Sequence, residues 1–170
     1  MNRLIPRFVH TLRPKKIAER NRKLHLIFNA YKLVYEKLRQ DTGLIFIHFN
    51  KSNDLKTMVC VEDKKKKEHA IQLDDVLFVV QEKAELLHDR LHRLKAEKKN
   101  QELQMALEAF LSLVQRRINA GITDLDMLIE KNYGFVGDRP IQLDVGRVCL
   151  GSTPGEYDRI AASLAPFYAL

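Results

Sequence analysis

The sequence has few cysteines and no long apolar run, and each absence narrows the possible function classes. Its 170 residues include two cysteines, Cys60 and Cys149, whose spacing matches no metal motif. No apolar run approaches the roughly 20 residues that span a bilayer. Pro6 and Arg7 interrupt the basic N-terminus before a signal peptide could form. We therefore expect a cytoplasmic protein with two free thiols and no transmembrane segment.

The composition is that of one globular domain. Apolar residues make up 45% of the chain and charged residues 30%, a balance typical of folded proteins. The length allows one domain with a real hydrophobic core and is too short for two ordinary domains. We expect an irregular basic arm over residues 1–13 and a single domain over residues 14–170.

The positive charge is concentrated in the first 40 residues. The chain carries a net charge of +7, and residues 1–40 hold eleven Lys or Arg against two acids, Glu19 and Glu36. A basic segment can dock on nucleic acid, a membrane surface or an acidic protein, or it can be a solvated helix face. The candidate docking residues are Arg3, Arg7, Arg13, Lys15, Lys16, Arg20, Arg22 and Lys23.

Hydrophobic periodicity predicts an α+β fold, in which a small antiparallel sheet is flanked by helices. The expected helices cover residues 15–40, 84–94, 103–118 and 156–167. The expected strands cover residues 44–49, 55–61 and 70–73, and residues 76–80 are a strand or a helix start. The turn cluster at 50–54 predicts a hairpin between the first two strands. Gly137-Asp138 predicts another hairpin, between residues 133–136 and 141–143.

The polar residues best suited to chemistry lie between Gly121 and Arg147. They are Asp124, Asp126, Asn132 and Asp144. Carboxylate and amide oxygens are the ligands of the hard ion Mg²⁺. Phosphoryl transfer needs such ligands and a carboxylate that orients a hydroxyl. The alternative is structural. Asp124 would cap a helix over residues 125–131, Asn132 would end it, and Asp144 would be a turn residue.

The order of these residues resembles the protein kinase-like superfamily. A helix over about 100–120 is followed by a loop with Asp126, by Asn132 six positions later, by a hairpin and by Asp144-Val145-Gly146. The resemblance implies a domain that binds ATP and Mg²⁺. It implies that Asp126 is the catalytic base, with Asp124 as the alternate, and that Asn132 and Asp144 are the Mg²⁺ ligands.

The resemblance also implies a layout. Residues 14–82 would be the small-lobe-like part, with the helix 15–40 in the place of the regulatory helix and residues 76–82 leading to the hinge. Residues 83–170 would be the helical part with the polar loop. The segments TGLIFIHFNKS, FVVQEKAELL and NYGFVGDRPIQLDVGRV are also similar to a conserved protein group of chlamydia-like bacteria, which supplies no known activity.

The sequence departs from the kinase-like pattern in five places. No His-Arg precedes Asp126, and the interval from Asp126 to Asn132 is one residue longer than usual. No glycine-rich phosphate loop is present, no Val-Ala-Ile-Lys strand is present, and only 24 residues follow Gly146. The resemblance therefore implies a truncated or degenerate kinase-like core. Such a core could be a fragment, a minimal phosphotransferase or a pseudokinase.

One further pair of residues has a metal-binding spacing. His88 and His92 stand at i and i+4, a geometry that can bind Zn²⁺ on a helix. No third ligand is evident beside them, so we expect two exposed helix histidines.

Overall fold

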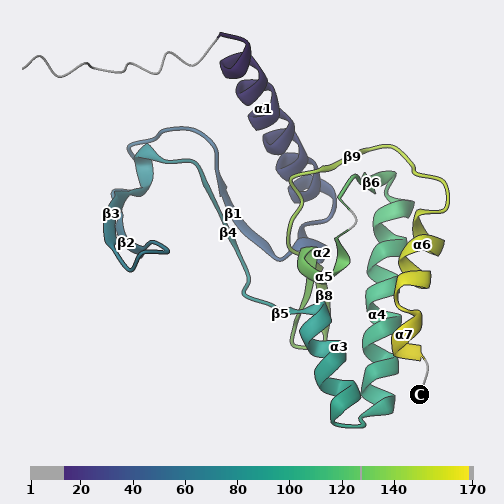
Figure 1. The fold of residues 1–170 in the computed structure, drawn as a ribbon. Helices are drawn as coiled ribbons and strands as arrows, with labels where there is room; N and C mark the ends of the chain where they lie inside the picture. The colour runs from purple at the N-terminus through teal and green to yellow at the C-terminus, as the bar shows by residue number, and fades with distance from the viewer. Residues whose placement is uncertain (1–13, 127, 169–170) are drawn as a thin grey trace, which may run out of the picture.

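The computed structural model describes residues 14–126 and 128–168, so the arm expected over residues 1–13 lies outside the described residues. The elements form an α+β fold with small antiparallel sheets, which confirms the predicted fold class (Figure 1). The helices are α1 (Pro14–Lys37), α2 (Arg39–Thr42), α3 (Leu87–Ala96), α4 (Asn100–Asn119), α5 (Ile129–Asn132), α6 (Glu156–Ser163) and α7 (Ala165–Tyr168). The strands are β1 (Leu44–His48), β2 (Met58–Glu62), β3 (Glu68–Gln72), β4 (Phe78–Gln81), β5 (Glu85–Leu86), β6 (Ile122–Asp124), β7 (Tyr133–Val136), β8 (Arg139–Gln142) and β9 (Val148–Leu150).

The helix predicted over residues 15–40 is present, but it is interrupted at Leu38. Thr42 closes the short α2 by donating its hydroxyl to the carbonyl oxygen of Leu38 at 3.2 Å. Gly43 then adopts a left-handed φ of 61°, which suits glycine because it has no Cβ, and the chain turns into β1. Gly43 is therefore the C-terminal cap of α2.

The predicted hairpin between residues 44–49 and 55–61 is wrong. β1 pairs antiparallel with β4, and β2 pairs with β3 in a separate hairpin between them. The pairing changes because the apolar run in β4 gives β1 a partner that can be buried: Ile47 and Val79 are opposite each other and pack toward α1. Residues 76–80, left open between strand and helix, are therefore largely strand. Figure 1 shows the β2–β3 hairpin set apart from the helices.

The base of this hairpin is tied down by the carboxylate of Asp74, which is 6% exposed. Its Oδ1 accepts hydrogen bonds from the Ser52 hydroxyl at 2.5 Å and from the Leu55 amide at 3.1 Å. Its Oδ2 accepts bonds from the Lys56 amide at 2.8 Å and the Gln72 side chain at 3.0 Å. These bonds, the Ser52 bond first, hold the pKa of Asp74 well below its usual range.

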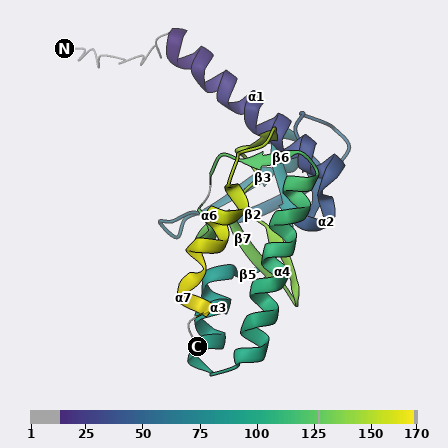
Figure 2. The same ribbon diagram turned by 90° about the vertical axis from the view of Figure 1, so that its right-hand side faces the viewer.

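The main core lies between α3, α4 and α6 and the sheet β5–β7–β8 (Figure 2). Leucines of α3 and α4 recur at helical spacing and are buried, as periodicity predicted. Phe110 of α4 is fully buried and meets Tyr133 of β7 edge to face at 5.1 Å. The predicted hairpin around Gly137 is confirmed as β7–β8. This core fixes where the strand before the polar loop and the hairpin after it lie.

A second core joins α1 to the polar loop. Ala30 and Val34 of α1, and Leu38 just after it, pack with Ile122 of β6 and with Val145, which follows β8. The N-terminal half of α1 extends beyond this contact (Figures 1 and 2). Within residues 14–126 and 128–168, no helix is long and apolar enough to cross a membrane.

The Asp74 carboxylate yields a prediction about the hairpin. Asp74→Ala removes four hydrogen bonds, so we expect faster amide hydrogen exchange in β2 and β3 and unchanged exchange in α4. Because the pKa of Asp74 is lowered in the folded state, its stabilisation is present above the unfolded value of about 3.9 and is lost as the pH falls below it. Acid should therefore loosen the wild-type hairpin and affect the variant less.

Asp75→Ala is the matched control, because this neighbouring carboxylate is largely exposed and meets only Lys51 at 3.5 Å. Equal exchange rates in the two variants would show that Asp74 does not anchor the hairpin.

Candidate functional site

The polar loop connects β6 to α5, and its first residues, directly after β6, are extended. β6 pairs with β9, and the Leu125 amide continues this contact by donating to the carbonyl oxygen of Arg147 at 3.2 Å. Among the described residues after β6, helix begins at Ile129, in α5. The alternative of a helix over residues 125–131 capped by Asp124 is therefore wrong, because Asp124 is bound into a strand.

Asp124 is buried, and protein groups use both of its oxygens. Oδ1 accepts the Asp126 amide at 2.8 Å. Oδ2 accepts the Tyr133 hydroxyl at 3.1 Å and the Gln142 side-chain amide at 2.8 Å. Burial raises the pKa of the Asp124 carboxyl above its ordinary value. Burial also raises the pKa of the Tyr133 phenol. Asp124 thus acts as a structural acceptor that shapes the loop.

A buried guanidinium lies between two carboxylates at the same place. Arg117, in the last turn of α4, donates Nη2 to Glu156 Oε1 at 2.5 Å, and its Nη1 lies 3.3 Å from Asp124 Oδ2. All three side chains are at most 2% exposed. The Nε and Nη1 atoms of Arg117 make no hydrogen bond with described residues. One cation therefore faces two anions in a region that excludes water.

Glu156 connects this centre to the C-terminal helix. Its Oε2 accepts the Thr123 hydroxyl at 2.9 Å, and its Oε1 accepts the Asp124 amide at 3.3 Å. Thr123 also shares a hydrogen bond of 2.6 Å with Thr153. The start of α6 and the strand before the polar loop are thus held as one unit.

Asp126 and Asn132 are joined by a hydrogen bond. The Asn132 side-chain amide donates to the backbone carbonyl of Asp126 at 3.0 Å, which spans the loop from β6 to α5. Asn132 is 5% exposed. Its Oδ1 atom accepts no hydrogen bond from the described residues. The carboxylate of Asp126 accepts none either, and its Oδ2 lies 3.5 Å from Nη1 of Arg147.

Asp144 is brought to the same loop by the β7–β8 hairpin. The Leu143 amide donates to the carbonyl oxygen of Asn132 at 2.7 Å, so the residue before Asp144 is bonded to the candidate ligand. The Asp144 side chain is exposed, and its Oδ1 accepts the Gly146 amide at 3.0 Å. Its other oxygen accepts no hydrogen bond within the described part of the chain. Asp126, Asn132 and Asp144 therefore lie on segments that are hydrogen-bonded to one another.

The oxygen atoms that remain free are of the type that binds Mg²⁺. Among the described residues, such oxygens belong to Asn132 and Asp144 and to Asp126, whose carboxylate accepts no hydrogen bond but is paired with Arg147, whereas those of Asp124 are occupied. Across the described ranges, no three His, Cys, Asp or Glu side chains form a metal-binding group. A site of Asn132 and Asp144 would contain one such residue, so bound phosphates and water would have to complete it.

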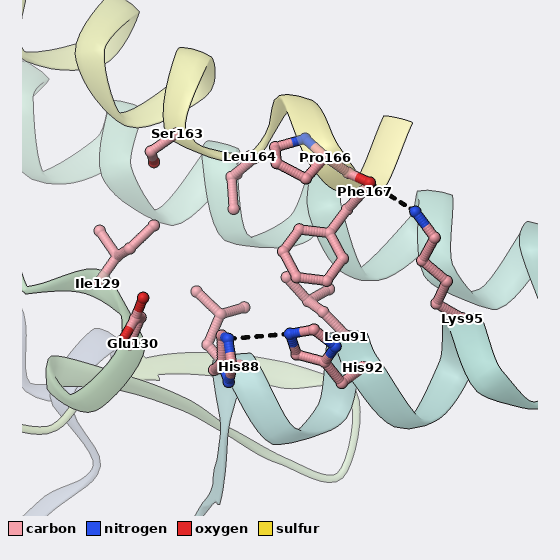
Figure 3. Close-up of a pocket in the computed structure, with 11 residues that line it drawn as sticks. His88, Leu91, His92, Lys95, Ile129, Glu130, Ser163, Leu164, Pro166 and Phe167 are labelled. Atoms are coloured by element: carbon pink, nitrogen blue, oxygen red, sulfur yellow. Dashed lines mark hydrogen bonds between the residues drawn. The ribbon is translucent and has the colours of Figure 1, made fainter. Parts of the chain in front are cut away.

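His88 and His92 line a cavity of about 430 Å³ between α3 and the α6–α7 segment (Figure 3). Their Nε2 atoms are 2.9 Å apart, and the ring of Phe167 lies at their edge, with centroids 6.4 Å and 5.1 Å away. His92 is exposed, as expected for both, and His88 is half-buried; the two form a hydrogen-bonded pair at the pocket wall. Glu130 lines the same pocket, but the described residues supply no three-ligand group there.

Sequence reasoning missed Arg117 and Glu156. The signal for Arg117 was its position, because it follows the buried stripe of Phe110 and Val114 at helical spacing, where a solvated charge does not fit. A buried cation needs a buried anion, but the sequence does not identify Glu156 as that partner.

The central cation yields a prediction about stability. Arg117→Leu leaves the Asp124 and Glu156 carboxylates buried without their cation, which should lower the free energy of unfolding by about 3–5 kcal/mol at neutral pH. The loss should shrink as the pH falls, because burial raises the pKa of the Asp124 carboxyl and protonation removes its charge. Urea unfolding at two pH values measures both effects.

Arg116→Leu is the control. Arg116 is the neighbouring residue of α4, is 50% exposed and pairs with Asp41 at 2.6 Å on the surface. Its loss should cost less than about 1 kcal/mol. Similar losses for the two variants would contradict a buried ionic centre.

Comparison with known proteins gives no family for this chain. No protein-family model matches it, no curated protein matches it, and no solved structure matches it.

Proposed function

We propose that the chain is a kinase-like domain that binds a nucleotide–Mg²⁺ complex, as a pseudokinase or a minimal phosphotransferase. The observation that carries the proposal is the division among the four polar residues. Both oxygens of Asp124 accept structural hydrogen bonds, whereas Asp126, Asn132 and Asp144 keep side-chain oxygens that accept no hydrogen bond from the described residues. The element order also supports it: a long helix, an extended polar loop, a hairpin and Asp-Val-Gly follow in sequence.

The proposed roles follow from these positions. Asn132 and Asp144 would hold Mg²⁺ through their side-chain oxygens, and the bound ion would offset the negative charge of the ATP phosphates. Asp126 would orient the hydroxyl that accepts a phosphoryl group. We do not assign the role of alternate base to Asp124, because both of its carboxylate oxygens already accept hydrogen bonds. The sequence contains no glycine-rich loop over the phosphates, which favours weak binding.

The nucleotide proposal predicts a thermal shift. ATP with Mg²⁺ at about ten times its Kd should add about 1.4 kcal/mol to the folded state. For a chain of this size, that raises Tm by about 3–6 °C. Asp144→Asn should abolish the shift because it removes a metal ligand. Asp126→Asn should keep it, because Asp126 is proposed to act on the hydroxyl and not on the metal.

Asp89→Asn is the matched control, an exposed carboxylate on α3 far along the chain from the loop. The proposal fails if ATP and Mg²⁺ give no shift in the wild type. It also fails if Asp144→Asn shifts as much as Asp89→Asn.

We also propose that the basic face of α1 docks an anionic partner. Lys16, Arg20, Arg22 and Lys23 are all exposed on the part of α1 that extends beyond the body. Among them only Lys23 has a close acidic partner, Glu19 at 2.9 Å. Arg3, Arg7 and Arg13 lie outside the described residues. The cations of α1 are thus available to solvent and to an acidic surface.

Retention on a heparin column tests this docking role. We expect retention that falls steeply with salt, because each cation displaces a counterion from the polyanion. The double variant Lys16→Glu/Arg20→Glu should elute at clearly lower salt than the wild type. Lys65→Glu/Lys67→Glu, which reverses two exposed charges at the hairpin tip, is the control. Equal elution of the two variants would remove α1 from the docking surface.

A further inference from the structure

A groove of about 480 Å³ lies between α1 and the segment that contains β9. Figure 1 shows β9 passing beside α1. Three leucines from separate segments line it: Leu26 of α1, Leu125 after β6 and Leu150 of β9. They are 59%, 65% and 65% exposed. Isolated exposed leucines are ordinary, but leucines that gather at a hollow mark an interaction surface.

The shape of the groove fits a helix. α1 contributes Leu26, Asn29, Ala30 and Leu33, which stand at i, i+3, i+4 and i+7 and form one face over two turns. Ala30 is 3% exposed, so a small side chain forms part of the floor while leucines form the rim. A ridge of side chains from a second helix can pack between such rims.

Cations surround this apolar face. Arg22 lies one turn before Leu26, and Lys37 lies one turn after Leu33, so both are on the groove side of α1, and both are exposed. Arg147 lines the opposite wall, and its side chain is 68% exposed. The groove therefore has basic groups at both of its ends and on its far side.

Two acids of α1 and one at the far wall are paired, whereas Asp144, two residues before the groove residue Gly146, has no ion-pair partner among the described residues. On α1, Glu19 meets Lys23 at 2.9 Å and Glu36 meets Lys32 at 3.9 Å. Asp126 at the far wall is 3.5 Å from the arginine there. The α1 segment carries seven Lys or Arg against these two Glu, so the field over the groove is positive.

We propose that this groove binds an acidic amphipathic helix of a partner protein, whose leucine-type anchors fill the hollow while its carboxylates face the surrounding cations. The proposal rests on the docking role of α1 and names its partner class. A second copy of the chain would bring the same cations together in a two-fold contact. A bilayer is flat and cannot reach the floor at Ala30. Nucleic acid offers phosphates but no anchors for three leucines.

The test uses the full chain and a fluorescein-labelled helical peptide with Leu at i, i+3, i+4 and i+7 and Glu at the other positions. We expect saturable binding by fluorescence anisotropy. Leu26→Asp and Leu150→Asp should each weaken it about tenfold or more, because they place a charge on the apolar rim. Both positions are exposed, so the fold should persist, and circular dichroism checks this.

Met105→Asp is the matched control, a helix position on α4 that is 60% exposed and outside the groove. It should bind the peptide as the wild type does. A peptide with Lys in place of Glu should bind at least about tenfold more weakly, because the cations then repel it.

Several outcomes would overturn the proposal. They are an absence of saturable peptide binding, equal binding by Leu26→Asp and Met105→Asp, and equal binding of the Lys peptide. The proposal also fails if the wild type binds phosphatidylserine vesicles, Leu26→Asp does not, and neither binds the peptide. That result would identify the groove as a membrane-binding surface. If the protein does not bind the peptide but is still retained on heparin, the groove proposal alone is rejected. If it neither binds the peptide nor is retained on heparin, the docking role of α1 is rejected as well.

Discussion

The structure around the polar loop depends on one buried guanidinium. Arg117 closes α4, Asp124 ends β6 and Glu156 starts α6, and their side chains meet where water is excluded. An ion inside a protein is tolerated only when partners compensate for its lost hydration, so these three segments must keep their places together. The excess of one buried negative charge adds a cost. Hydrogen bonds from Thr123 to Glu156, and from Tyr133 and Gln142 to Asp124, offset this cost in part.

This constraint explains how the polar residues divide their tasks. Because Asp124 is bound from several sides, it aims the next residues away from the strand, and its Oδ1 holds the amide of Asp126 in a turn. Asn132 then crosses the loop to the carbonyl oxygen of Asp126. The carboxylates that remain open to solvent belong to Asp126 and Asp144, which have no structural task that consumes both oxygens. A chemical role for the loop would therefore depend on Asp126 and Asp144. The buried ionic centre helps to position these residues but does not bind their carboxylates.

The sequence predicted the elements better than their pairing. Periodicity located the long helices and the hairpin around Gly137 because both signals are local. It failed for β1, whose partner β4 lies beyond an inserted hairpin, because strand pairing depends on where buried faces meet in space. Sequence reasoning also could not decide whether Asp124 is a helix cap or a catalytic base. The structure shows that its carboxylate is bound by Arg117, Tyr133 and Gln142, and these contacts cannot be read from the local sequence.

The same limit applies to α1, where a single helix serves two surfaces. Val34 of α1 and Leu38 just after it pack into the core, and this was predictable from spacing. Leu26 lies one turn before Ala30 on the same face of the helix, but it stays 59% exposed beside β9. A periodic pattern predicts that a helix face is apolar. It does not predict whether another part of the same chain covers that face. Because β9 comes close enough to form a wall but not to fill the hollow, α1 keeps an apolar face that its own fold leaves open.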